Sequence, residues 1–82
     1  MTYQEREISK NQLEKLLQTL DLDEGIRIEN KSNMIFINRS AKRYCVNLSS
    51  QGNEEFFYQN SVKEVLDFLN GKTDQESKIF SY

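Results

Sequence analysis

The sequence predicts a small α+β domain with the element order α-β-β-β-β-α, an antiparallel meander sheet with two helices packed on one face. Two observations predict the helices: each of two serines opens a capping-box spacing, and each is followed by an apolar stripe of helical period. A third observation predicts the sheet, because the apolar residues between the helices mostly alternate and the connections are too short for parallel crossovers.

The first helix is expected at about residues 10–21. Ser9 and Gln12 have the S-x-x-Q spacing, in which each side chain satisfies a backbone N–H at the start of the helix. The stripe that follows repeats at i, i+3, i+4 and i+7 and consists of Leu13, Leu16, Leu17 and Leu20. This spacing places four leucines on one face of the helix.

Four strands are expected between Gly25 and Gln59. The apolar residues of these strands are Ile26 and Ile28, the run 34–37, then Tyr44, Val46 and Leu48, and finally the aromatic run 56–58. Segments rich in Asn, Ser and Gly separate them, as is typical of turns. A meander is the simplest topology for strands so closely spaced.

The second helix is expected to begin after Ser61, which forms an S-x-x-E capping box with Glu64. Its apolar stripe is Val62, Val65, Leu66 and Leu69, and Asn70-Gly71 is a typical helix end. We therefore assign residues 1–71 to a single domain and residues 72–82 to a C-terminal tail, in which Thr73 and Glu76 could cap a short third helix. The apolar tail residues Ile79, Phe80 and Tyr82 are expected either to dock on the sheet or to serve as a recognition peptide.

Composition argues against most catalytic chemistry. The chain has no histidine and a single cysteine, so a Ser–His or Cys–His pair cannot form within it and a closed zinc site lacks its usual ligands. We therefore expect no enzymatic activity and no cofactor. The sequence contains neither an apolar run long enough to span a bilayer nor an N-terminal signal pattern, so a cytoplasmic location is the default expectation.

The open face of the sheet is the leading candidate for function. If the isoleucines point towards the helices, the period of two sends Met34, Phe36, Cys45 and Phe57 to the other face. Such an apolar patch indicates a protein partner or self-association, through the face or the edge of the sheet. Two other interpretations stay open: the tail covers the patch, or the facing is inverted by a register error of one residue.

A basic turn is the alternative candidate. Residues 27–43 carry a net charge of +4, whereas the segments on either side each carry −3. Arg39, Lys42 and Arg43 could contact phosphates, which would make the chain a nucleic-acid-binding module with salt-dependent affinity. The simpler interpretation is a solvated turn whose charges balance the acidic helices.

The order helix, three strands, helix resembles that of double-stranded-RNA-binding domains and of HicA-type toxins. The segment Lys31-Ser32-Asn33-Met34-Ile35-Phe36 is similar to the glycine-serine-histidine stretch of the toxins, but Asn33 stands where the catalytic histidine would be. The lysine-rich start of the second helix in the RNA-binding domains is replaced by Val62-Lys63-Glu64-Val65. The resemblance therefore implies an architecture and no function.

Overall fold

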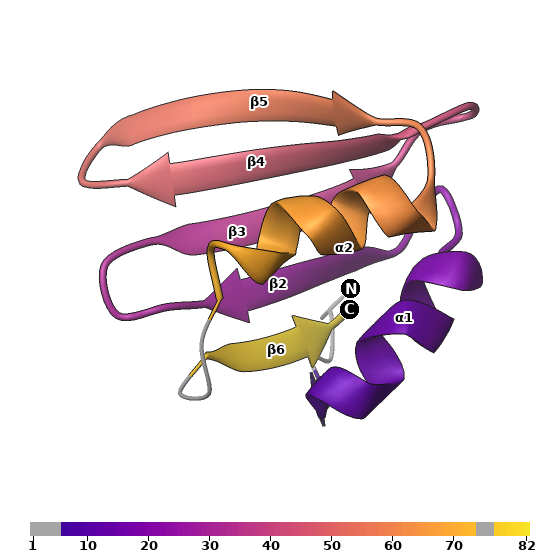
Figure 1. The fold of residues 1–82 in the computed structure, drawn as a ribbon, viewed down its shortest axis with the longest axis horizontal. Helices are drawn as coiled ribbons and strands as arrows, with labels where there is room; N and C mark the ends of the chain where they lie inside the picture. The colour runs from indigo at the N-terminus through magenta and orange to yellow at the C-terminus, as the bar shows by residue number, and fades with distance from the viewer. Residues whose placement is uncertain (1–5, 74–76) are drawn as a thin grey trace.

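The computed structural model describes residues 6–73 and 77–82. The elements in chain order are β1 (Arg6–Ile8), α1 (Lys10–Gln18), β2 (Gly25–Glu29), β3 (Met34–Arg39), β4 (Tyr44–Ser50), β5 (Asn53–Gln59), α2 (Val62–Asn70) and β6 (Lys78–Ser81) (Figure 1). The six strands form one sheet in the order β1-β6-β2-β3-β4-β5, and every neighbouring pair is antiparallel. The predicted fold class, a small α+β domain with an antiparallel sheet and two helices, is confirmed.

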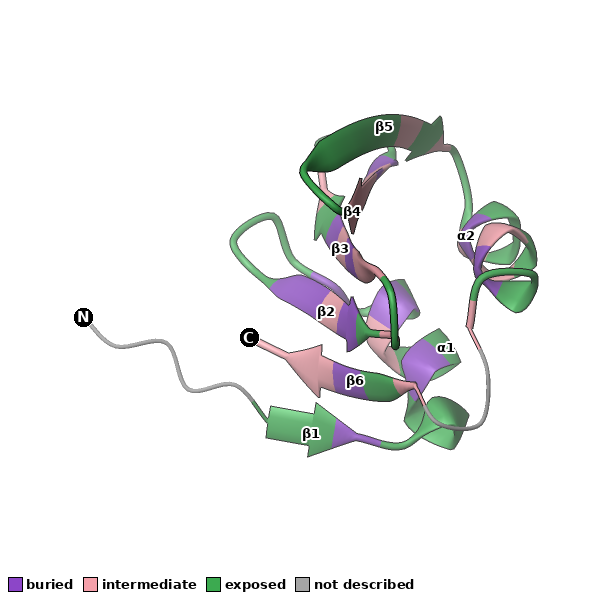
Figure 2. Ribbon diagram, turned by 90° about the vertical axis from the view of Figure 1, so that its left-hand side faces the viewer, coloured by how far each residue is buried: buried purple, intermediate pink, exposed green. Residues whose placement is uncertain are grey.

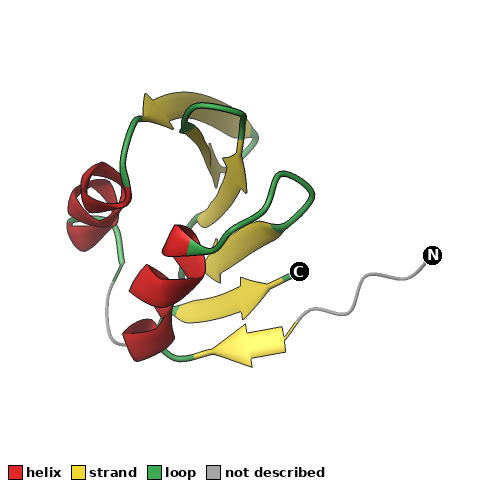
Figure 3. Cartoon of the chain, turned by 90° about the vertical axis from the view of Figure 1, so that its right-hand side faces the viewer, coloured by secondary structure: helices red, strands yellow, loops and turns green. Residues whose placement is uncertain are grey.

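The sheet is curved, and both helices lie on the same side of it (Figures 2 and 3). The buried core lies between the sheet and these helices. It is formed by Ile8, Leu13, Leu17, Leu20, Ile26, Ile28, Ile35, Ile37, Tyr44, Val46, Val65, Leu69 and Ile79. Among the described residues, no polar or charged residue is buried as a whole.

The C-terminal segment is not a tail on the surface, which corrects the sequence-based prediction. Lys78–Ser81 forms β6 and lies between β1 and β2 within the sheet. Ile79 pairs with Ile8 on one side and with Ile28 on the other, and only 2% of its surface is exposed. The third helix suggested after Thr73 falls partly on residues 74–76, outside the described residues.

The two helices begin where the capping spacings predict. At α1 the backbone N–H of Ser9 donates to Oε1 of Gln12 at 3.1 Å, and at α2 Oγ of Ser61 accepts from the backbone N–H of Glu64 at 3.2 Å. Each helix has nine residues. Within the described part of the chain, no helix is long and apolar enough to cross a membrane.

The end of α1 is tied to the sheet by two polar side chains. The hydroxyl of Tyr44 donates to the carbonyl of Leu17 at 2.8 Å, and Nη1 of Arg39 donates to the carbonyl of Leu20 at 3.0 Å. Carbonyls in the last turn of a helix lack their usual helical partners, and the hydroxyl of Tyr44 supplements the long bond that the Leu17 carbonyl accepts from the backbone N–H of Leu20 at 3.5 Å. The carbonyl of Leu20 lies just beyond the end of α1. Arg39 also lies over the ring of Tyr44 at 5.7 Å, so its guanidinium faces the interior side of the sheet.

The β4–β5 hairpin fixes which side chains of β5 face the core. Its loop is only two residues long, because Ser50 pairs with Asn53. The two loop residues, Gln51 and Gly52, have positive φ values of 48° and 86°. This conformation is typical of a type I′ turn, which matches the twist of the strands it connects. The resulting register places Phe57 opposite the buried Val46.

Candidate functional site: the open face and the β5 edge

The face of the sheet opposite the helices carries a row of side chains that runs across all six strands. The register aligns, in order, Glu7, Phe80, Arg27, Phe36, Asn47 and Phe56. Aromatic rings thus alternate with polar side chains along this row. We call this surface the open face.

On the half of the open face formed by β6, β2 and β3, the charged side chain contacts other side chains of the chain. Nη1 of Arg27 lies 2.7 Å from Oε2 of Glu29 and 3.9 Å from the sulfur of Met34, and its guanidinium carbon lies 4.4 Å from the centre of the Phe80 ring. The Arg27 side chain is only 18% exposed. Phe36, which pairs with Arg27, is half-buried. The charge of Arg27 and the ring of Phe80 therefore already have partners within the chain.

The other half of the open face leaves aromatic surface in solvent. Phe56 is 57% exposed and Tyr58 is 58% exposed, although both lie on an ordered strand. The guanidinium of Arg43, in the turn before β4, lies 4.9 Å from the centre of the Tyr58 ring. The two exposed rings lie on β5, an edge strand of the sheet, and the cation lies beside them (Figure 1).

The outer edge of β5 has main-chain groups that the sheet does not use. In an antiparallel ladder, hydrogen-bonded and non-bonded residue pairs alternate. The backbone N–H of Ser40 donates to the carbonyl of Arg43 at 2.8 Å, which fixes this alternation from β3 to β4 and hence to β5. It follows that Asn53, Glu55, Phe57 and Gln59 bond to β4.

The remaining residues of β5, Glu54, Phe56 and Tyr58, direct their N–H and C=O groups away from the sheet. Their side chains lie on the open face, because Phe56 pairs with Asn47 and Tyr58 pairs with Cys45. The same three residues therefore present both a bonding edge and the exposed rings. The opposite edge strand, β1, has three residues within the described part of the chain, and a short edge strand is a common protection against unwanted pairing.

Asn47 places an unsatisfied polar atom on the open face. Its Oδ1 is buried and, among the described residues, has no hydrogen-bond partner. The register places Asn47 between Phe36 and Phe56, so rings lie on both sides of it. An unsatisfied buried acceptor costs about 1–3 kcal/mol.

The structure brings together three of the four residues that the sequence suggested for a protein-binding face. Met34, Phe36 and Cys45 lie on the open face. The placement of Phe57 is wrong: its ring lies 4.8 Å from that of Phe68 in α2, and it packs against the core. The residues on either side of it, Phe56 and Tyr58, are the exposed ones. The two-residue hairpin loop sets the register of β5 and was the signal that could have identified them.

The basic residues suggested for nucleic acid do not share a surface. Arg39 points to the helix side and is bonded to Leu20, whereas Arg43 lies over Tyr58 on the open face. Lys42 is exposed in the turn between β3 and β4. The three charges therefore do not form one phosphate-binding cluster.

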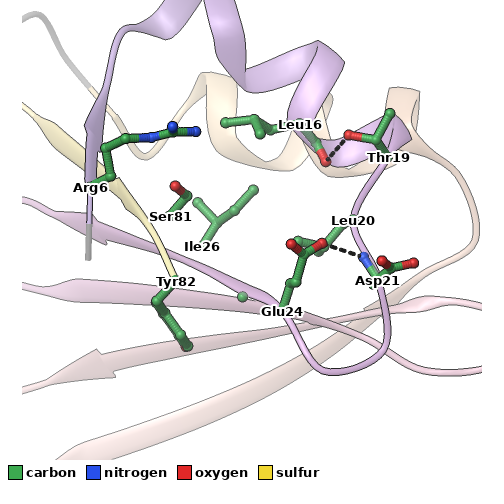
Figure 4. A pocket seen from close by; sticks show the side chains of 10 residues that line it. Arg6, Leu16, Thr19, Leu20, Asp21, Glu24, Ile26, Ser81 and Tyr82 are labelled. Atoms are coloured by element: carbon green, nitrogen blue, oxygen red, sulfur yellow. Dashed lines mark hydrogen bonds between the residues drawn. The ribbon is translucent and has the colours of Figure 1, made fainter. Parts of the chain in front are cut away.

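A pocket lies elsewhere, between the end of α1 and the strands β1, β2 and β6 (Figure 4). Its volume is about 610 Å³, and its charged lining residues are Arg6, Asp21 and Glu24. Glu24 is already engaged, since its Oε1 accepts from the backbone N–H of Asp21 at 2.9 Å. Among the described residues, no three His, Cys, Asp or Glu side chains gather where they could hold a metal ion.

Comparisons with protein-family models, with curated proteins and with solved structures find no match for this chain.

Proposed function

We propose that this protein is a non-enzymatic interaction module that binds a protein partner by accepting an extended segment along the outer edge of β5. The observation that carries this proposal is the coincidence of unused main-chain groups and exposed aromatic rings on Glu54, Phe56 and Tyr58. Addition of a strand to an open sheet edge is a common mode of peptide recognition, in which the main chain supplies affinity and alternate side chains supply specificity.

The chemistry of the edge defines the segment that would fit it. Cross-strand neighbours on one face interact directly, and aromatic or β-branched side chains pair favourably with aromatic ones. A matching segment therefore carries an apolar residue opposite Phe56. It carries an acidic residue near the guanidinium of Arg43, which would form a charge-assisted contact beside Tyr58.

The edge is suited to moderate affinity. Each main-chain hydrogen bond contributes about 0.5–1.5 kcal/mol net and each cross-strand pair about 0.2–1 kcal/mol. These gains are reduced by the cost of ordering an extended segment and of association itself. We therefore expect a reversible complex.

Selection of partners from a displayed library of random peptides, followed by mapping on the protein, tests this proposal. Peptides selected on the wild type are expected to shift the amide resonances of Glu54, Phe56 and Tyr58 most strongly. Glu54→Pro should abolish their binding, because proline removes an outward N–H without breaking a bond to β4. Glu54→Gln is the matched control, since it also removes the charge but keeps the N–H.

The proposal is refuted if the selected peptides shift residues lining the pocket at α1 instead of β5, or if Glu54→Pro binds them as well as Glu54→Gln does. A single-stranded oligonucleotide that shifts Arg39, Lys42 and Arg43 together, with an affinity that falls steeply with salt, would favour the alternative function.

A further inference from the structure

We propose that the segment accepted by β5 is the β5 strand of a second copy of this chain, paired antiparallel about a two-fold axis at Phe56. This inference rests on the proposed function, because both use the outer edge of β5, and it adds the identity of one partner. Such pairing would join two sheets into one continuous sheet and would leave each copy with only the short strand β1 as a free edge.

The length of β5 favours this centre. Phe56 is the middle residue of Asn53–Gln59, so an antiparallel copy centred there aligns the strand with itself over its whole length. Phe56 also directs its main-chain groups outwards, so the two copies can exchange hydrogen bonds at the centre. The two Phe56 rings then lie directly opposite each other on the open face.

Charge complementarity selects the same centre. In this register Glu54 of one copy lies opposite Tyr58 of the other, on the same face as Arg43, whose guanidinium lies 4.9 Å from the centre of the Tyr58 ring. The two-fold axis generates this opposite-charge contact twice. A centre at Glu54 or Glu55 would instead place like carboxylates directly opposite each other.

A centre nearer the C-terminal end is less favourable. Moving it to Tyr58 leaves part of the strand unpaired and brings the two Arg43 side chains towards each other. It also removes Glu54 from its position opposite Tyr58. The centre at Phe56 therefore uses the most main chain and places opposite charges together.

Charge-reversal substitutions test the proposed contact, because loss of the fold alone would not be rescued by mixing two variants. Self-association of the full chain is measured by sedimentation equilibrium at low ionic strength, for the wild type, for Arg43→Glu and for Glu54→Arg. Each variant places like charges at both contacts of its homodimer, so we expect dimerisation about tenfold weaker or more. An equimolar mixture of the two variants should dimerise again, because both contacts of the mixed dimer join opposite charges.

Two control variants carry the same changes of charge without the contact. Lys42→Glu alters the neighbouring residue of the turn, and Glu55→Arg alters the neighbouring residue of β5, which faces the helix side. Both are expected to dimerise within about threefold of the wild type. Thermal unfolding of each variant, followed by circular dichroism, verifies that the fold is retained.

The inference is overturned if the wild type is monomeric at about 1 mM, if the mixture of Arg43→Glu and Glu54→Arg stays monomeric, or if the controls lose dimerisation to the same extent. These outcomes are distinguishable from failure of the proposed function. A wild type that remains monomeric but binds displayed peptides at β5 retains the strand-accepting edge and loses only the second copy as its partner.

Discussion

Replacing Ile79 by alanine tests whether the C-terminal segment is an integral strand of the sheet. Ile79 is 2% exposed and lies between Ile8 and Ile28, so its truncation leaves a cavity at the junction of three strands. Truncations of this kind cost about 2–5 kcal/mol. A domain of 82 residues has a total stability of about 4–12 kcal/mol, so the loss would be a large fraction of the whole.

Thermal and urea unfolding, followed by circular dichroism, measure this effect. A loss of about 3 kcal/mol corresponds to a decrease in Tm of about 12–24 °C for a domain of this size. Leu22→Ala is the matched control, because Leu22 is 66% exposed and its truncation should change the stability by less than about 0.5 kcal/mol. If Ile79→Ala unfolds at the same temperature as Leu22→Ala, the placement of β6 within the sheet is refuted.

Three further substitutions test individual contacts. Tyr44→Phe removes the hydroxyl that donates to the carbonyl of Leu17 and should lower the free energy of unfolding by about 1 kcal/mol in urea titrations; an unchanged value would contradict this bond. Gly25→Ala would place a Cβ 2.6 Å from Cζ of Tyr82, at the far end of a side chain that can shift, so we expect a loss below about 1 kcal/mol that Tyr82→Ala removes; a larger loss that persists in the double variant would show that this contact is not the cause. Asn47→Val removes the unsatisfied acceptor and introduces a better strand former, so it should raise the free energy of unfolding by about 1 kcal/mol, and a less stable variant would contradict the assignment of Oδ1 as unpartnered.

The sequence was most informative where a local signal and a periodic pattern coincide. Ser9 and Ser61 begin the two helices, because a capping spacing and an apolar stripe both require a helix there. The central strands follow from the alternation of apolar residues and from short connections. In these segments the local sequence alone is sufficient to define the element.

The two terminal strands could not be predicted in this way. β6 has four residues, of which only Ile79 is buried, and β1 has three, of which only Ile8 is buried. Such short segments have no measurable period. They become strands because they pair with each other and with β2, and these contacts link residues far apart in the sequence.

The sequence identified only part of the candidate site, because the facing of β5 is not encoded in its own residues. Met34, Phe36 and Cys45 follow from alternation with buried neighbours, whereas the run of aromatic residues from Phe56 to Tyr58 has no alternation to indicate its facing. Its facing is fixed by the length of the preceding hairpin loop. The availability of the β5 edge is a property of strand order in the folded sheet, which no single segment encodes.

Amide hydrogen exchange along β5, measured at low and at high protein concentration, tests most directly the claim that this edge is open and accepts a strand. In dilute solution we expect fast exchange at Glu54, Phe56 and Tyr58 and slow exchange at Glu55 and Phe57, whose N–H groups bond to β4. At high concentration, protection should appear at the first three residues and remain unchanged at the other two. Uniform protection along the strand in dilute solution, or a Phe56 amide that gains protection neither on concentration nor on addition of a selected peptide, would contradict an open, strand-accepting edge.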